Sequence, residues 1–457
     1  MIRHSVQSSF ACRRPVDFPD RPARRAGTGG PGDVASRSRV TGPGHRPATP
    51  QEPAISDAPA TPPALPPLHA AWLVALTGVD GPPSEPRATC GDCVMCAGVA
   101  RSGTRVTFSP DVACCDYVPH LANVLTGRAL AGPGRAGVLA RIGRRTGVTP
   151  LGLGLTQDDV RRMVAGRADA GRATGVRCPH LDTAARRCTV WETRNAVCST
   201  WFCRHERGAV GRRFWQAARD LLIAVEEEVA LRRLHDGGLP PDQVRAVVAH
   251  REAVRATVRR ANAGQGPVPA ADDASPQWYA RMWGGWQGRE EEWFTRCAAP
   301  PLAVDPAALP HGVRALADDV RRCWADLADR RVPDRLTFTP GPGTEATEDV
   351  LRLFGYSPFD PVVLPAELEP ALWLLDGRPL ADVLADAERA GHARPDVDVL
   401  RRLHDAGVAL APAPDGGADP AGPSLALDDP APGRVLVLGP DRHLDLDAGR
   451  VDRGAGA

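Results

Sequence analysis

The sequence predicts a mainly α-helical protein with a loop-rich cysteine-cluster region and a C-terminal winged-helix-like α+β module. Three observations predict this class. Apolar residues recur at the spacing of helix faces between residues 157 and 330. Nine of the twelve cysteines gather between residues 90 and 203, where the helical patterns are short. Three short helical patterns and a short strand then follow one another over residues 366–410.

Composition and charge exclude several classes of function. All 56 basic residues are arginine, so catalysis that needs a lysine amine is excluded. The net charge of +1 gives no overall attraction to nucleic acid or anionic lipid. No segment reaches the ~20 apolar residues of a membrane-spanning helix, and no apolar stretch follows the arginines near the N-terminus. We therefore expect a cytoplasmic protein without membrane contacts, whose thiols stay reduced.

Composition shifts divide the chain into five segments. These are a disordered Pro/Arg/Gly-rich tail (1–68), a cysteine-cluster metal-binding domain with trailing amphipathic helices (69–265), a Trp-rich helical segment (266–335), a winged-helix-like module (336–412), and a linker with a C-terminal strand (413–457). The first segment has no hydrophobic periodicity and cannot bury enough apolar surface to fold.

Helices are predicted in the middle of the chain from apolar residues three, four or seven positions apart. Three of them cover Gln157–Val164, Phe214–Val229 and residues 311–330. A fourth begins after Asp242, its predicted N-cap residue, and reaches Val258. The tryptophans between residues 278 and 293 have spacings that favour helix packing over ligand stacking. We interpret Cys297 and Cys323, on apolar helix faces, as core thiols.

The C-terminal module is predicted from helices over 366–375, 380–389 and 396–406 and a strand at 408–410. Gly377 and Gly407 stand where left-handed helix caps are expected, and residues 434–438 would supply the wing. The third helix carries three acids against two arginines, which disfavours DNA binding. A protein or peptide partner bound by strand addition and a purely structural or dimerising role both stay open.

The spacing of the nine clustered cysteines is the most informative feature of the sequence. Cys90-x2-Cys93-x2-Cys96 is followed after 17 residues by Cys114-Cys115, and after 62 more by Cys178-x9-Cys188-x9-Cys198-x4-Cys203. Short gaps let neighbouring thiolates turn toward one centre, as zinc and iron–sulfur clusters require. An odd number of thiols in a reducing compartment fits metal ligation better than disulfides or ordinary core cysteines.

Thiolates repel one another, and they share a small volume only when a cation neutralises them. The predicted metal ligands are Cys93, Cys96, Cys114, Cys115, Cys178, Cys188, Cys198 and Cys203, with Cys90 as an alternate or extra ligand. This set suits two four-coordinate zinc sites, or one four-iron cluster with a structural zinc. The CxxCxxC run favours an iron–sulfur cluster slightly over zinc.

The run from Cys188 to Cys203, preceded by Cys178-Pro179-His180-Leu181, resembles the YkgJ-type cysteine-cluster family, a zinc- or iron-chelating domain. The family pattern is CxxCxxCC, then CPxL, then CxIYxxRPxxCRxFxC. Matching or conservative positions are Cys178, Pro179, Leu181, Cys188, Val190, Trp191, Arg194, Cys198, Trp201 and Cys203. Asn195 and Ser199 replace the usual Pro and Arg. An insertion splits the front motif, so which of its five cysteines correspond to the family's four stays open.

The resemblance covers about 115 residues and implies a metal-binding protein without an assigned biological role. One branch of the family resembles flagellin lysine methylases, in which such a cluster is implicated in methyl transfer. A cluster-dependent enzyme that modifies a protein or peptide is therefore the first alternative, and a metal- or redox-responsive DNA-binding regulator is the second. The sequence identifies no catalytic residue, and whether the chain is an enzyme stays open.

Several side chains near the cysteines are candidates for supporting roles. We expect Arg194 to offset negative charge and to donate hydrogen bonds to sulfur, and Trp191 and Trp201 to form a dry wall. We interpret the remaining polar candidates as surface or solvated loop residues: His120, His180, His205, Asp116, Asp182 and Glu192.

Overall fold

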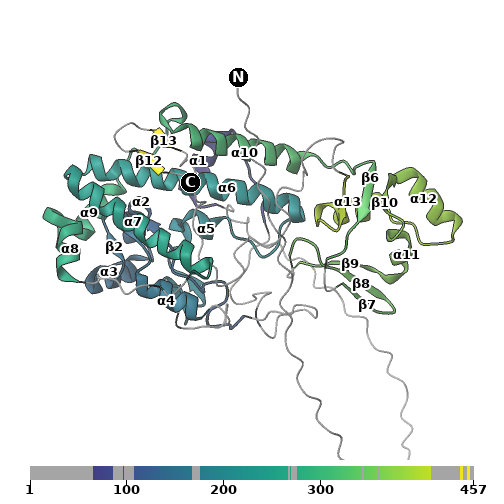
Figure 1. Ribbon diagram of the computed structural model, residues 1–457, viewed down its shortest axis with the longest axis horizontal. Coiled ribbons are helices and arrows are strands. Elements are labelled where there is room, and N and C mark those ends of the chain that lie inside the picture. Colours follow the sequence, from purple (N-terminus) through teal and green to yellow (C-terminus); the bar gives the residue numbers. More distant parts are fainter. Residues whose placement is uncertain are drawn as a thin grey trace, which may run out of the picture. The chain divides into compact units, whose positions relative to one another are not determined.

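A computed structural model of the protein describes residues 65–85, 96, 108–166, 175, 177–265, 268, 275–341, 344–357, 360–412, 443–445 and 450–452. Helices dominate these residues, and the strands form small antiparallel sheets of two or three strands (Figure 1). The prediction of a mainly α protein with some β structure is confirmed. The predicted tail up to residue 64 and the predicted wing at 434–438 lie outside the described residues.

The largest hydrophobic core of the described residues surrounds the 29-residue helix α6 (Gly208–Asp236), along which α10 (His311–Ala328) packs (Figure 1). The other helices of this part are α1 (Pro67–Thr77), α2 (Asn123–Leu130), α3 (Arg135–Arg144), α4 (Gln157–Ala165), α5 (Ala196–Ser199), α7 (Pro241–Asn262), α8 (Pro276–Trp283) and α9 (Glu290–Cys297). No helix within the described ranges combines the length and apolar character needed to cross a lipid bilayer.

The helices predicted in the middle of the chain are present as α4, α6, α7 and α10. The start of α7 differs from the prediction, because Pro240 is its N-cap residue and Pro241 its first residue. Proline suits the first position of a helix, because an N–H group there would have no acceptor within the helix and its absence costs nothing. The prediction that Asp242 caps the helix is therefore wrong, and Asp242 instead lies in the first turn, where a negative charge favours the helix dipole.

Aromatic side chains fill the larger core. Trp283 and Trp293 are completely buried, which confirms that the tryptophan spacing reflects helix packing. Cys297 is buried in the same core and Cys323 packs against it, as predicted for core thiols. Helices α2 and α9 approach so closely that a Cβ atom on Gly127 would lie 1.9 Å from a backbone carbonyl oxygen of α9. Only glycine fits at this crossing.

Short strands connect the helices in the cysteine region. A three-stranded sheet has the order β1-β3-β2, from Leu121–Ala122, Gly152–Leu153 and Val148–Thr149. A hairpin joins β4 (Leu181–Asp182) to β5 (Arg187–Cys188), with Leu181 opposite Cys188. Near the C-terminus, β12 (His443–Asp445) pairs with β13 (Arg450–Asp452).

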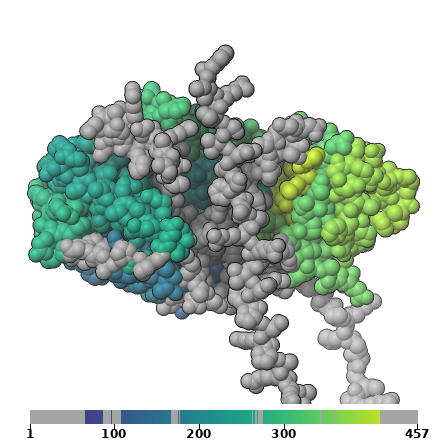
Figure 2. All heavy atoms as spheres, viewed as in Figure 1, coloured from purple at the N-terminus to yellow at the C-terminus, as the bar shows by residue number. Residues whose placement is uncertain are grey.

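The C-terminal part has its own hydrophobic core, and its surface is yellow-green in Figure 2. One sheet has the order β10-β6-β11, from Asp376–Pro379, Arg335–Phe338 and Ala409–Leu410. The other has the order β7-β8-β9, from Glu345–Ala346, Val350–Leu353 and Val362–Pro365. Its helices are α11 (Glu369–Leu372), α12 (Leu380–Arg389) and α13 (Val397–Asp405).

The predicted second and third helices of the module and its last strand are found as α12, α13 and β11. The predicted first helix over 366–375 is shorter, since a 3-10 turn leads into α11, which ends at Leu372. Gly407 follows α13 with a φ of 73°, as expected of a left-handed cap. Gly377 also has a positive φ, but it lies in strand β10, so its predicted role as a helix cap is wrong.

Candidate metal centre

Cys115 contacts two other cysteines of the cluster. Its side chain makes hydrogen bonds with the thiols of Cys114 and Cys178. The backbone N–H of Cys178 donates to the carbonyl oxygen of Cys115 at 2.7 Å, which fixes the two segments side by side. The hydrogen bond with Cys114 lowers the pKa of Cys115. The bond with Cys178, burial and the charges of Cys178 and Cys198 together outweigh it, so the pKa of Cys115 is raised above its ordinary value.

Cys198 is positioned by the one-turn helix α5, whose N-cap is Asn195. The Oδ1 atom of Asn195 accepts a hydrogen bond from the backbone N–H of Cys198 at 3.0 Å. The Cys198 sulfur lies 3.1 Å from the hydroxyl oxygen of Tyr117, which is two residues after Cys115. Burial raises the pKa of Cys198 to about 12, with smaller contributions from Cys188 and Cys114. Tyr117 was not predicted as part of the site, because nothing in its sequence neighbourhood distinguishes it from a core tyrosine.

Two further cysteines of the motif meet in a smaller cluster. Cys96, which is 2% exposed, forms an isolated parallel bridge with Phe108 and packs with Ala113. Cys203 packs against this cluster. Cys96 of the front motif and Cys203 of the later segment therefore contribute to one small cluster.

The structure brings together most of the predicted ligands that it describes. Hydrogen bonds or charge interactions link five of them: Cys114, Cys115, Cys178, Cys188 and Cys198. Cys96 and Cys203 belong to the separate small cluster that includes Ala113, the residue before Cys114. Cys90 and Cys93 lie outside the described residues. Within the part of the chain that is described, no three His, Cys, Asp or Glu side chains are arranged so that they could hold a metal ion. The described thiols are near one another, but they are not arranged as the ligands of one metal ion.

Arg194 and Trp191 pack against each other next to Cys198. The guanidinium of Arg194 stacks on the Trp191 ring at 3.6 Å and donates to the backbone carbonyls of Trp191 and Cys198. Its positive charge lowers the pKa of Cys198, as expected of an offsetting charge. The Trp191 side chain is 37% exposed, so the prediction that it forms a dry wall is wrong.

His180 differs most from its predicted surface position. Its side chain is 1% exposed, and neither ring nitrogen has a hydrogen-bond partner among the described residues. Burial and, less strongly, Arg141 lower the pKa of His180 to about 4, so the imidazole is neutral at pH 7. Its backbone N–H donates to the Cys178 sulfur at 3.4 Å. A neutral, unpartnered imidazole beside a cysteine is available as a nitrogen ligand.

The remaining polar candidates divide into buried and exposed groups. Asp116 is 8% exposed, so its interpretation as a solvated residue is wrong. Asp182 accepts backbone hydrogen bonds within the turn of the β4–β5 hairpin, and Glu192 is exposed, as expected of loop residues. His120 and His205 are partly buried rather than on the surface.

A buried polar network anchors the Cys198 turn to the helical core. His69 of α1 contacts the Ser199 hydroxyl through Nδ1 at 2.9 Å and Glu226 of α6 through Nε2 at 2.8 Å. Glu226 also accepts the backbone N–H of Ala196 at 2.6 Å. The Glu–His–Ser order resembles a hydrolase triad, but Ser199 is 1% exposed and donates to backbone carbonyls, so it is no accessible nucleophile. The network is structural.

No protein-family model matches the chain, and neither a curated protein nor a solved structure is significantly similar to it. The resemblance to the YkgJ-type family therefore depends on the cysteine motif itself.

Proposed function

We propose that this chain is a metal-thiolate protein whose cysteine cluster binds an iron–sulfur cluster or zinc. The observation that carries the proposal is the contact of Cys115 with both Cys114 and Cys178, next to Cys198. These thiols come from segments more than 60 residues apart in the sequence. Cysteines used only as core residues would be distributed among apolar side chains rather than placed against one another.

The chemistry of the donor set fits a cation. The charges of Cys178 and Cys198 raise the pKa of Cys115, and those of Cys188 and Cys114 raise the pKa of Cys198, because thiolates in a buried volume repel one another. A bound cation would reverse this effect, since it stabilises several thiolates at once. Backbone donation to sulfur, as from His180 to Cys178, is typical of ligated thiolates, and the unpartnered His180 imidazole adds a possible nitrogen ligand. Cys114, Cys115, Cys178, Cys188 and Cys198 would hold the group, with Cys96 and Cys203 beside them.

The test is elemental analysis with an absorption spectrum of the full chain, purified without oxygen. Iron with absorbance near 400 nm that bleaches on reduction would identify an iron–sulfur cluster, and colourless protein with about two zinc per chain would identify zinc sites. Cys178→Ser should lower the metal content per folded chain. Cys297→Ser is the matched control, because Cys297 is a buried thiol of the helical core. Folded wild-type protein without a transition metal would contradict the proposal.

For the C-terminal module we infer a winged-helix variant. The order β10-β6-β11, with α12 and α13 between the outer strands, supports it. Its central strand β6 precedes the helices in the sequence and pairs with β11, the strand predicted at 408–410. The last residue of α13, Asp405, is paired with Arg207 of the larger part, and Arg401 is paired with Asp398. A helix held in this way is poorly placed to enter a DNA groove, and salt-dependent binding to random duplex DNA would overturn this interpretation.

A further inference from the structure

The last cysteine of the motif stands directly before a short segment that leads to the C-terminal module. Cys203 is followed by residues 204–208, which we call the strap, and helix α6 begins at the last of them, Gly208. Helix α13 of the C-terminal module contacts α6. The strap therefore connects the cysteine cluster with the place where the module meets the helical part.

Tyr356 of the C-terminal module is bonded to the strap. Its hydroxyl oxygen accepts a hydrogen bond from the backbone N–H of His205 at 3.0 Å, and the hydroxyl donates to the Asp360 carboxylate. The His205 ring packs edge-on against the Tyr356 ring, with 5.6 Å between the ring centroids. Tyr356 is 4% exposed, so water competes little for these bonds. One phenol thus joins the residue two positions after Cys203 to the C-terminal module.

The C-terminal module fixes the position of Tyr356. The Tyr356 side chain belongs to the hydrophobic core of the module, as does Leu403 of α13. The backbone N–H of Tyr356 donates to the carbonyl oxygen of Ala406, the residue after α13, at 3.0 Å. The preceding Gly355 permits this approach, since a Cβ there would lie 2.1 Å from the same carbonyl oxygen. The place of the phenol is therefore set by α13 and the core of the module.

Further contacts hold both ends of the strap against the same module. At its start, the Arg204 guanidinium lies 3.8 Å from the Asp360 carboxylate, and near its end Arg207 pairs with Asp405. Ala209, the residue after the strap, is buried in the hydrophobic core of the C-terminal module. The chain that follows Cys203 is thus attached to the module at several successive points.

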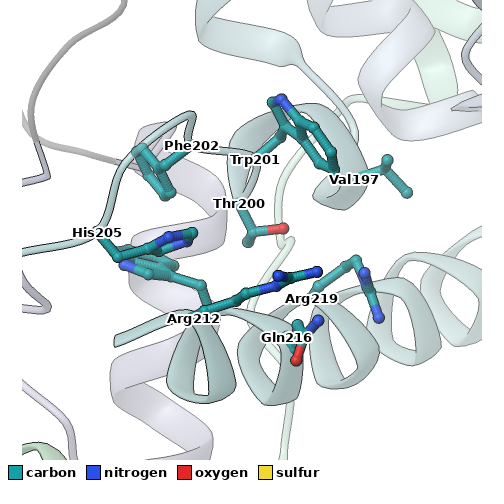
Figure 3. Close-up of a pocket in the computed structure, with 9 residues that line it drawn as sticks. Val197, Thr200, Trp201, Phe202, His205, Arg212, Gln216 and Arg219 are labelled. Atoms are coloured by element: carbon teal, nitrogen blue, oxygen red, sulfur yellow. The ribbon is translucent and has the colours of Figure 1, made fainter. Parts of the chain in front are cut away.

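The strap also packs against the helical part. Figure 3 shows His205 at the end of the turn that follows α5, near Arg212 of α6. Arg212 donates to the backbone carbonyl of Tyr356. The backbone N–H of Glu206 donates to the buried Glu85 carboxylate at 2.6 Å. Because packed side chains surround the strap on both sides, a shift of the module would be passed on to it.

We propose that the C-terminal module positions Cys203 through Tyr356, and that the state of the module is thereby coupled to the cysteine cluster. Cys203 is two residues from His205, and it packs against the small cluster that contains Cys96 and Phe108. A displacement of Tyr356 would therefore move a sulfur atom of this cluster. Tyr356 is a positioning residue, which acts through the strap and contacts no thiol in this role. The coupling rests on the proposed metal centre: a metal that holds Cys203 would stabilise the attachment of the module, and the attachment would favour the metal by the same factor.

The test measures how fast each thiol of the full chain, treated with a chelator, reacts with iodoacetamide, and mass spectrometry assigns the rates to single cysteines. Tyr356→Phe keeps the ring but removes the acceptor of the His205 N–H, so it should raise the rate at Cys203 about fivefold. The rate at Cys297 should not change, because this buried core thiol reports general loosening. Tyr279→Phe is the matched control, since it removes a buried phenol that donates to Glu290 in the helical part.

An unchanged rate at Cys203 in Tyr356→Phe would overturn the proposal, as would equal increases at Cys203 and Cys297 or in the two variants. Competition titrations with zinc test the coupling, and Tyr356→Phe should weaken zinc binding about fivefold while Tyr279→Phe does not. Unchanged zinc affinity in Tyr356→Phe would overturn the coupling and leave the metal proposal intact. A wild type that binds neither zinc nor iron would contradict the metal proposal and the coupling, while the alkylation rates would still decide whether Tyr356 positions Cys203.

Discussion

Arg207 pairs with Asp405, 198 residues further along the chain, through two N–H groups that donate to the two carboxylate oxygens. The same guanidinium donates to the backbone carbonyls of Leu327 and Asp329 at 2.6 and 2.7 Å. One buried arginine at the start of α6 thus joins the end of α10 to the end of α13. Gly208 lets this approach happen, because a Cβ there would lie 2.4 Å from the carbonyl oxygen of Asp405.

Arg207→Ala should destabilise the protein by about 3 kcal/mol, because it leaves the Asp405 carboxylate and two carbonyls without donors. The midpoint of urea unfolding measures this change. Arg401→Ala is the control, since Arg401 makes an exposed pair with Asp398 on α13 and should change stability by at most about 0.5 kcal/mol. Equal effects of the two substitutions would show that the Arg207 contacts contribute little.

Gly127→Ala should destabilise the helical core by about 3 kcal/mol, because the new methyl group would overlap the carbonyl oxygen of Phe294 and force α2 and α9 apart. Gly143→Ala provides the comparison in helix α3, where a new Cβ meets no atom within 4 Å. That substitution should stabilise the protein by about 0.5 kcal/mol through helix propensity. Thermal unfolding of both variants tests the difference in sign.

Glu226→Ala should destabilise the protein by about 3 kcal/mol and loosen the Cys198 turn, because it removes the partner of His69 and of the Ala196 N–H. Hydrogen exchange of the Ala196–Thr200 amides, together with urea unfolding, measures both effects. Glu228→Ala removes an acid two positions along, whose partner is Arg232 of the same helix. A loss of more than about 1 kcal/mol in that control would show that α6 is sensitive to any lost acid.

The stability of the protein should decrease as pH falls from 6.5 toward 3, partly because of His120. Burial and the charges of Arg255, Arg251 and Arg141 lower the pKa of His120 to about 3. Between these pH values the unfolded chain binds a proton that the folded chain does not, so acid favours unfolding. At pH 5 this amounts to about 1 kcal/mol, after allowing for partial exposure of the side chain.

His120→Gln should make unfolding less sensitive to acid than it is in the wild type, by that amount at pH 5 relative to pH 7. His235→Gln, which changes an exposed histidine of α6, should leave the pH dependence as it is. Parallel pH profiles for the wild type and His120→Gln would contradict the assignment.

The sequence predicted the features that depend on local pattern. Apolar residues at helix spacing predicted α6 and α10. The contact of Cys115 with Cys178 is long-range, and it was predicted only because clustered cysteines are typical of a shared metal centre. Features that depend on distant partners were not predictable. Nothing near His69 signals that it will contact Ser199, 130 residues away. The central strand β6 was missed for the same reason, because its partners β10 and β11 lie some 40 and 70 residues further along.

The contacts of Ser199 have a consequence for the proposed metal centre. The residue that follows Cys198 is tied to α1 and α6 by bonds that involve no sulfur atom. The turn that carries Cys198 is therefore held in place by contacts that would not depend on a bound metal. If the chain binds a metal, a chelator should leave a folded apoprotein that binds the metal again, whereas zinc fingers unfold when their zinc is removed.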